Sequence, residues 1–215
     1  MSRVYILVEG QTEEAFVNEL LVPHYSNIGL YLTPIIVSTS PGHKGGVSSY
    51  AKIRPQIERL CKQGDAHVTT LFDLYALPKD FPGRENPNYP HHGRGADKAV
   101  FIESFVNNDI GKANFSANIV AHEFEALLFS QLDAFREWTD DDDVLEPLIK
   151  ARQNASPEDI NDGVETAPSK RILRVMKSYQ KPVHGPLIAC SIGLDTIRQE
   201  CPHFHCWLAR MERLI

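Results

Sequence analysis

The chain has 215 residues, of which 42% are hydrophobic and 23% charged, and its formal net charge is −6 at pH 7. This length suits one domain with a proper core, and no apolar run or leader pattern indicates a membrane span or a signal peptide. The acidic charge argues against indiscriminate nucleic-acid binding, and four scattered cysteines without disulfide-framework spacing predict a cytoplasmic protein.

The first predicted element is a strand at residues 4–8, a run of five apolar residues typical of a strand buried on both faces. After it, Thr12 is predicted to cap a helix whose first turn carries Glu13 and Glu14, where carboxylates complement the helix dipole. Glu9 therefore lies on a strand-to-helix turn, at the sheet edge where open α/β sheets bind ligands. The alternative is that Glu9 is an ordinary solvated turn residue.

Three more apolar runs are predicted strands, and the segments between them have apolar residues at the spacing of a helix. This βαβαβ order requires right-handed crossovers, so we expect a parallel sheet flanked by helices. Pro55 should kink or restart the helix that contains it. The predicted strands are residues 32–37, 67–72 and 117–121, and the predicted helices between them span residues 50–60 and 96–110.

Two loops attract attention because they follow predicted strands. Residues 40–46 carry one cation, Lys44, which we take as a candidate substrate-binding residue. Residues 76–95 are rich in proline, glycine and histidine, and unstructured loops of this length in small domains are usually lids or binding loops. His91 and His92 could contact substrate there, although exposed loop histidines are common.

The chain after residue 131 is predicted to be helical, so we divide it into an α/β core, residues 1–131, and a helical C-terminal extension, residues 132–215. The acidic run at residues 140–143 is predicted to be a solvated loop or helix start. Cysteine and histidine at residues 201–206 lack the spacing of a zinc site, so packing of a terminal helix is the favoured interpretation.

Basic residues recur from residue 168 to residue 181 at helical spacing, with apolar residues on another face. A basic stripe of this kind is the footprint of a site for a phosphate backbone, and a solvated helix face is the alternative. Lys170 is the sharpest catalytic candidate, because a lysine near a metal site could stabilise transition-state charge. The stripe comprises Lys170, Arg174, Lys177 and Lys181, with Arg171 as a further substrate-binding candidate.

Acidic residues end several predicted strands. Asp73 ends the third, and Glu123 or Glu125 follows the fourth, so both should meet Glu9 at one edge of a parallel sheet. Carboxylates held so close repel one another unless a cation compensates, and Mg²⁺ takes a few carboxylates while keeping waters for a phosphate substrate. The plainer alternatives are that Asp73 forms a turn and that the two glutamates are helix-start acids.

His122, beside these glutamates, is a candidate general base or an orienting residue. Glu13 is either a further ligand or a partner of the helix dipole. Gly-x-Ser-x-Gly and Gly-x-x-x-x-Gly-Lys motifs are both missing from the sequence, which argues against a serine nucleophile and against P-loop hydrolysis of ATP.

The sequence resembles the TOPRIM fold of topoisomerases, primases and OLD-type nucleases. It is more closely similar to a prokaryotic TOPRIM-like family catalogued as domain of unknown function 4276. The stretches that carry the resemblance are residues 8–14 (Val-Glu-Gly-Gln-Thr-Glu-Glu), 43–46 (His-Lys-Gly-Gly), 72–75 (Phe-Asp-Leu-Tyr), 122–129 (His-Glu-Phe-Glu-Ala-Leu-Leu-Phe), 168–171 (Pro-Ser-Lys-Arg) and 201–204 (Cys-Pro-His-Phe).

The resemblance implies that Glu9 is the TOPRIM glutamate and Asp73 the first aspartate of an Asp-x-Asp motif. Tyr75 stands where the second aspartate belongs, which leaves the number of metal ions open, and Glu123 or Glu125 could restore the missing ligand. The expected metal ligands are therefore Glu9, Asp73, Glu123 and Glu125, and the expected catalytic residues are Glu9, Asp73, Glu123 and Lys170.

The resemblance further implies a Mg²⁺- or Mn²⁺-dependent nuclease, an effector of prokaryotic defence that is held in check by a separately encoded ATPase. RNA, including transfer RNA, is one substrate class that it suggests, and a homodimer is compatible with it. Two rivals stay open. One is a non-catalytic subunit that binds nucleic acid or a partner, and the other is a Mg²⁺-dependent phosphoryl-transfer enzyme acting on nucleotides.

Overall fold

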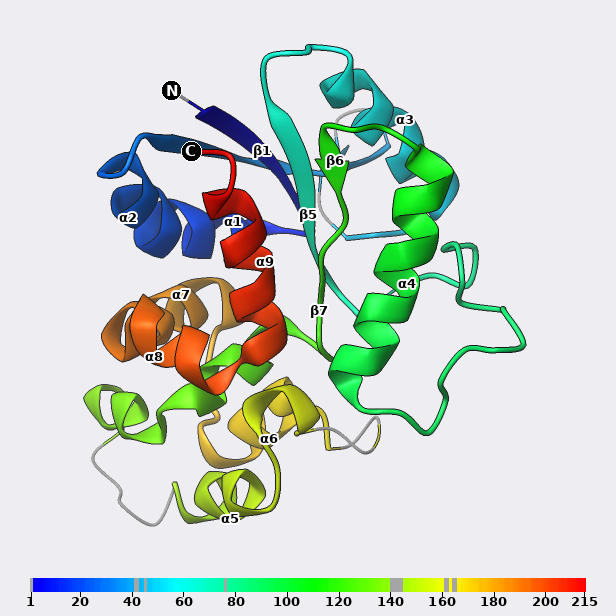
Figure 1. Cartoon of the computed structure of the whole chain (residues 1–215). Helices are drawn as coiled ribbons and strands as arrows, with labels where there is room; N and C mark the ends of the chain where they lie inside the picture. The colour runs from blue at the N-terminus through cyan, green and yellow to red at the C-terminus, as the bar shows by residue number, and fades with distance from the viewer. Residues whose placement is uncertain are drawn as a thin grey trace.

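A parallel sheet forms the centre of the molecule, as the computed structural model shows (Figure 1). The structure describes residues 2–40, 43–44, 46–75, 77–139, 145–160, 163 and 166–215. The sheet has the strand order β2-β1-β5-β6, with β7 pairing with β5 beyond β6, and each of these pairs is parallel. Its strands are β1 (Ser2–Val8), β2 (Leu30–Ile36), β5 (His67–Asp73), β6 (Phe115–Ser116) and β7 (Ile119–Val120).

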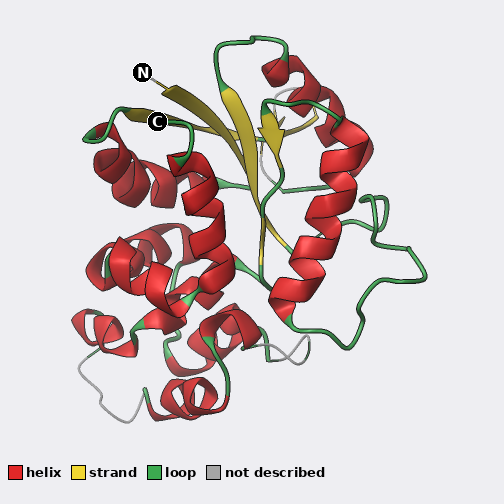
Figure 2. Cartoon of the chain, in the orientation of Figure 1, coloured by secondary structure: helices red, strands yellow, loops and turns green. Residues whose placement is uncertain are grey.

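Helices cover both faces of this sheet (Figures 1 and 2). One face packs on α3 (Tyr50–Cys61) and α4 (Gly95–Ile110). The other face packs on the helices that follow β1 and on the C-terminal helices. These are α1 (Gln11–Phe16), the π-helix η1 (Val17–Leu21), α2 (Val22–Ser26), α7 (Lys181–Ile192), α8 (Leu194–Glu200) and α9 (Pro202–Glu212).

The remaining elements are short. β3 (Ser38–Ser40) and β4 (His43–Lys44) form a separate antiparallel pair. Below the sheet in Figure 1 lie α5 (Glu146–Asn154) and α6 (Pro168–Val175), and the 3₁₀ helices are η2 (Phe124–Ser130), η3 (Leu132–Glu137) and η5 (Pro157–Asp159). The described part of the long loop, residues 77–94, consists of turns and irregular backbone.

The α/β fold with a parallel sheet and a helical C-terminal region is confirmed, including its strands β1, β2 and β5. Of the fourth predicted strand, residues 117–121, only β7 (Ile119–Val120) is a strand, and β6 (Phe115–Ser116) lies just before it. Between them, the Thr70 hydroxyl donates to the backbone oxygen of Asn118 at 2.7 Å and accepts from its nitrogen at 2.9 Å. A side chain therefore takes the place of the backbone ladder at this point.

One local prediction about helices was wrong. Thr12 does not cap α1, because the helix begins at Gln11 with Gly10 in the capping position, and Thr12 is buried. The Glu13 side chain accepts a hydrogen bond from the Gly10 nitrogen at 2.9 Å, and so serves as the cap. Pro55 lies inside α3, which runs from Tyr50 to Cys61 without a restart.

The basic stripe does not lie along one helix. α6 ends at Val175, residues 176–180 form a turn, and α7 begins at Lys181. Pro182 explains the break, since a proline in a helix interior clashes with the carbonyl four residues earlier and is tolerated in a first turn. Met176 and Tyr179 are buried within the turn.

The C-terminal helices share one hydrophobic core with the sheet. Val4 and Ile6 of β1 belong to the same buried cluster as Trp207 and Met211 of α9. The Trp207 indole also donates to the Thr69 hydroxyl at 3.0 Å, which ties α9 to β5. Within the described part of the chain, the helices are too short or too polar to cross a bilayer.

The close contact between α4 and the segments around it predicts a cost for enlarging Gly95. A Cβ there would lie 2.5 Å from His122 Nε2 and 2.6 Å from the backbone oxygen of Glu158. Overpacking of this kind costs about 1–3 kcal/mol, so Gly95→Ala should lower the free energy of unfolding in urea although alanine favours helices. Val100→Ala, at a 52% exposed position of the same helix, is the control and should change it by less than about 0.5 kcal/mol. Equal stability of the two variants would contradict the packing described here.

Candidate active site

Four acidic side chains meet at the carboxyl end of the sheet. Glu9 follows β1 and Asp73 ends β5, and the Asp73 nitrogen lies 3.4 Å from Glu9 Oε2. The chain after β7 brings in Glu123 and Glu125, because the Phe124 nitrogen donates to Asp73 Oδ1 at 2.8 Å. The structure thus brings together the acids that end the predicted strands.

A strained turn positions the two glutamates. His122 is the one non-glycine residue with positive φ (66°) in the part of the chain that the structure describes, a conformation that costs free energy unless its surroundings enforce it. Its backbone oxygen accepts a hydrogen bond from the Tyr75 nitrogen at 2.8 Å. Burial, followed by the charge of Lys98, lowers the pKa of His122 to about 4. At neutral pH this ring is therefore uncharged and a weak base.

The cation among these acids is Lys181, the first residue of α7. Its Nζ lies 2.9 Å from Glu125 Oε2 and 3.3 Å from Asp73 Oδ2. Glu125 is fully buried, and the Tyr179 hydroxyl donates to its other oxygen at 3.4 Å. Burial lowers the pKa of Lys181, but Asp73 and Glu125 outweigh it and raise that pKa.

Glu13 is a fifth acid of this cluster. It is buried at the start of α1, where its carboxylate caps the Gly10 nitrogen. Burial, followed by repulsion from Asp73, raises the pKa of Glu13 to about 8, and Lys181 opposes this rise. The same carboxylate thus caps the helix and lies near the other acids, and its role as a metal ligand stays a prediction.

The pKa values of the other glutamates of the cluster are raised as well. Burial, followed by Asp73, raises the pKa of Glu9 to about 7. Burial also raises the pKa of Glu125 to about 7, against the opposing charge of Lys181, and it raises the pKa of Glu123. One ammonium does not neutralise so many carboxylates, so the cluster has a strong affinity for protons or for another cation.

Glu123 also holds the start of a helix through hydrogen bonds. Both of its oxygens accept hydrogen bonds from Ser169, one from the backbone nitrogen and one from the hydroxyl. Because Ser169 lies in the first turn of α6, Glu123 caps that helix. Each oxygen keeps a second lone pair, so Glu123 could bind a metal ion while it holds Ser169.

Three of the predicted basic residues are exposed outside the cluster, and a fourth binds a backbone oxygen. Lys170, Arg174 and Lys177 are exposed on α6 and the turn after it, and Arg171 donates to the backbone oxygen of Thr166 at 2.7 Å. The Lys44 side chain and the acidic run at residues 140–143 lie outside the described residues. The lysine beside the acids is thus Lys181, whereas the sequence had pointed to Lys170 for that place.

The donor set suits a hard cation, but its present arrangement does not enclose one. Among the residues that the structure describes, no three Asp, Glu, His or Cys side chains are placed to hold a metal ion. Carboxylate oxygens are the ligands that Mg²⁺ prefers, and burial, followed for Glu9 and Glu13 by repulsion from Asp73, raises the pKa values of Glu9, Glu13 and Glu125. The chemistry therefore fits Mg²⁺, whereas the geometry is set around the ammonium of Lys181.

Of the C-terminal cysteines and histidines, Cys201 and His203 are buried, whereas His205 and Cys206 are exposed. Cys201 is buried with its sulfur 3.4 Å from the Ser130 hydroxyl. His203 is buried with its Nε2 2.9 Å from Glu103 Oε1. Both side chains therefore contribute to the packing of the terminal helix.

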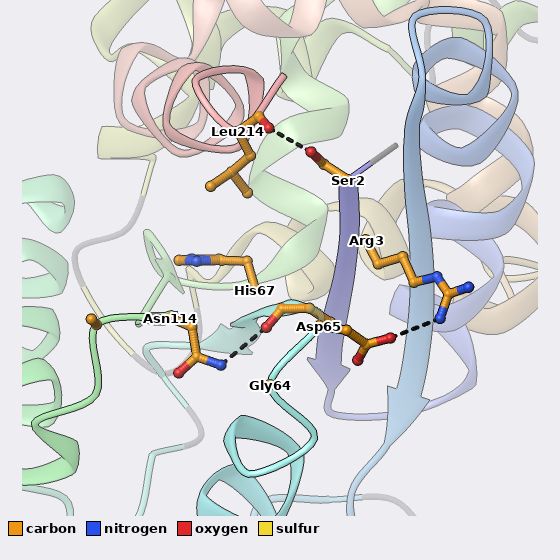
Figure 3. Close-up of a pocket in the computed structure, with 9 residues that line it drawn as sticks. Ser2, Arg3, Gly64, Asp65, His67, Asn114 and Leu214 are labelled. Carbon is orange, nitrogen blue, oxygen red and sulfur yellow. Dashed lines mark hydrogen bonds and ion pairs between the residues drawn. The ribbon is translucent and has the colours of Figure 1, made fainter.

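A second hollow lies at the opposite end of the strands, between the start of β1, the start of β5 and the segment before β6 (Figure 3). Its volume is about 350 Å³. Its charged residues neutralise each other, with Arg3 Nη1 2.9 Å from Asp65 Oδ2, and the Asn114 amide donates to the backbone oxygen of Ala66. The concentration of uncompensated charge at the carboxyl end makes that end the better candidate.

One family model matches the chain, over residues 8–212, and its description is Domain of unknown function (DUF4276). The matched region begins with the last residue of β1 and ends with the last residue of α9, so it includes every residue of the acidic cluster. No curated protein and no solved structure gives a significant match.

The raised pKa of Glu13 predicts how stability depends on pH without added metal. Its carboxyl has an ordinary pKa of 4.5 and a folded pKa of about 8, so between these values the folded state holds a proton that the unfolded state has lost. Stability then falls as the pH rises from about 4.5 to 8. Glu13→Gln should remove part of this fall, on the order of 1 kcal/mol or more, in urea unfolding at pH 5 and pH 8. An unchanged pH dependence in the variant would show that Glu13 ionises normally.

Proposed function

The chain belongs to the DUF4276 family, whose description assigns no activity, and on the basis of the acidic cluster we propose that it is a Mg²⁺-dependent phosphodiesterase that cleaves nucleic acid. The observation that carries this proposal is the excess of carboxylate over ammonium at the carboxyl edge of a parallel sheet. That edge is where open α/β sheets bind ligands. Mn²⁺ is the expected substitute for Mg²⁺.

Glu9, Asp73 and Glu125 would hold the ion, with Glu13 and Glu123 as further ligands. Bound there, it would orient an attacking water and stabilise the leaving oxygen in phosphodiester hydrolysis. If Glu9 does not hold the ion, its alternative role is to accept the proton of that water. The new phosphorus–oxygen bond forms as the bond to the leaving oxygen breaks, and that oxygen takes a proton from solvent.

Lys181 takes the role that the sequence had suggested for Lys170. Its ammonium already lies at the acids, so it is the lysine that can stabilise charge on a phosphate there. The exposed basic residues Lys170, Arg174 and Lys177 would hold the phosphate backbone beyond the site.

The biological setting rests on the resemblance to TOPRIM nucleases. By that analogy the protein is a cytoplasmic defence effector that acts on RNA, including transfer RNA, under the control of a separately encoded ATPase. The four cysteines, free in the structure, fit a reducing compartment.

One observation favours a second candidate, a non-catalytic subunit that binds nucleic acid or a partner protein. Lys181 pairs with both Asp73 and Glu125, as in a buried ion pair that serves the fold alone. Titration of Mg²⁺ or Mn²⁺ into the purified protein separates the two, because a binding subunit of this kind need not take up metal.

Glu9→Gln tests the catalytic proposal. The variant keeps the size of the side chain but removes its charge, so Mg²⁺-dependent cleavage should fall by about 10² or more. Asp73→Asn should act likewise, and the double variant should lose much less than the product of the two effects. The assay uses RNA and single- and double-stranded DNA, with and without the neighbouring ATPase.

Glu14→Gln is the matched control, because Glu14 lies in the same first turn of α1 and outside the acidic cluster. It should keep wild-type activity. Full activity in Glu9→Gln would refute the catalytic role of Glu9, and an inactive wild type on all these substrates would favour the binding subunit.

The basic residues of α6 predict a change in salt dependence. Each phosphate contact contributes roughly one unit to the slope of log affinity against log salt concentration. Lys170→Ala combined with Arg174→Ala should therefore weaken nucleic-acid binding and reduce this slope by about two, with unchanged thermal stability. Binding by fluorescence anisotropy at several salt concentrations measures the slope, and a wild-type slope in the double variant would mark a solvated helix face.

A further inference from the structure

The ammonium of Lys181 occupies a place that a hydrated metal ion would also suit. It contacts two carboxylates, Asp73 and Glu125, through one oxygen of each. The second oxygen of each acid is held by a fixed donor, the Phe124 nitrogen in one case and the Tyr179 hydroxyl in the other. The two oxygens that face the lysine are thus the ones that its departure would leave available.

This arrangement is costly for α7. Lys181 is the first residue of the helix, where the helix dipole disfavours a positive charge, and its side chain has lost most of its contact with water. The carboxylates must outweigh both penalties. A divalent cation meets the same two penalties, but it has twice the charge and can keep several of its own waters, so it is attracted more strongly to the same oxygens.

The Lys181 side chain also has access to solvent. Its side chain is 35% exposed, and the neighbours Gln180, Pro182 and Val183 are exposed around the start of α7. A long, flexible lysine side chain can therefore turn toward solvent by rotation about its own bonds, without movement of the helix.

We propose that Lys181 is a tethered counter-ion that a divalent cation displaces from Asp73 and Glu125, which sends its ammonium to the mouth of the site. The inference rests on the proposed function, because it needs a divalent cation to bind there. It explains why acids suited to a metal ion are not now arranged to hold one. It also orders the events, since the ammonium becomes free to meet a phosphate only after the metal has bound.

A lysine suits this exchange better than an arginine. An ammonium is a compact point charge on a flexible stem, whereas a guanidinium binds carboxylates through two parallel hydrogen bonds. Lys181→Arg should therefore hold the acids more firmly and weaken metal binding. Lys181→Met removes the competing charge and should strengthen it.

The direct test measures how accessible Lys181 is in the wild-type protein. The intact chain is treated with a limiting amount of acetic anhydride, with and without saturating Mg²⁺ or Mn²⁺, and acetylation is quantified residue by residue by mass spectrometry. Lys181 should react several times faster with metal than without it. Lys62, exposed just after α3, is the internal control and should react equally under both conditions.

Calorimetric titration of Mn²⁺ completes the test. Lys181→Met should bind the ion at least about tenfold more tightly than the wild type, given the strength of charge repulsion at such short range, and Lys181→Arg more weakly. Lys62→Met should bind as the wild type does.

Three outcomes decide the matter. Unchanged acetylation of Lys181 in a protein that calorimetry shows to be metal-bound would overturn the displacement. Failure of the wild type to bind either ion at millimolar concentration would overturn it as well. Faster acetylation with metal in a protein that cleaves no nucleic acid would support the displacement and refute the proposed nuclease, so the two proposals fail separately.

Discussion

The structure depends on one electrostatic constraint: among the residues that it describes, several carboxylates are buried around a single ammonium at the edge of a parallel sheet. Parallel strands bring their carboxyl ends together. The acidic residues at the ends of β1 and β5 therefore lie close together although their charges repel each other. Asp73 is the hub, since it contacts Glu9, the start of η2 and Lys181. Three distant segments of the chain are thereby fixed at one point.

Buried glutamates do further work as helix caps. Glu13 caps α1, Glu123 caps α6, and Glu158 accepts hydrogen bonds from the first two amides of α9 after Pro202. Each carboxylate satisfies amides that a helix start leaves without partners. The acids that suit the site chemically therefore also hold the helices around it in place, and close packing at Gly185, where a Cβ would lie 3.0 Å from Phe124, completes the fit of α7.

Local rules explain which parts of this could be predicted from the sequence. Glu9 and Asp73 end clear apolar strands, and the parallel order follows from alternating strands and helices, so their meeting was predictable. Lys181 was not placed, because helical periodicity was extended across residues 176–180, although Pro182 signals a new helix start. The αL turn at His122 depends on contacts with Tyr75 and Gly95 from other parts of the chain, and no local pattern encodes such contacts.

The separation of Lys181 from its partners along the chain has a consequence for biosynthesis. The acids at residues 9, 73, 123 and 125 leave the ribosome before the lysine, and the contact with Asp73 spans 108 positions. Chains begin to fold from their N-terminal end during synthesis, so the nascent sheet edge carries its negative charge without its own counter-charge. The carboxyl edge can therefore gain this counter-charge only after α7 has been made.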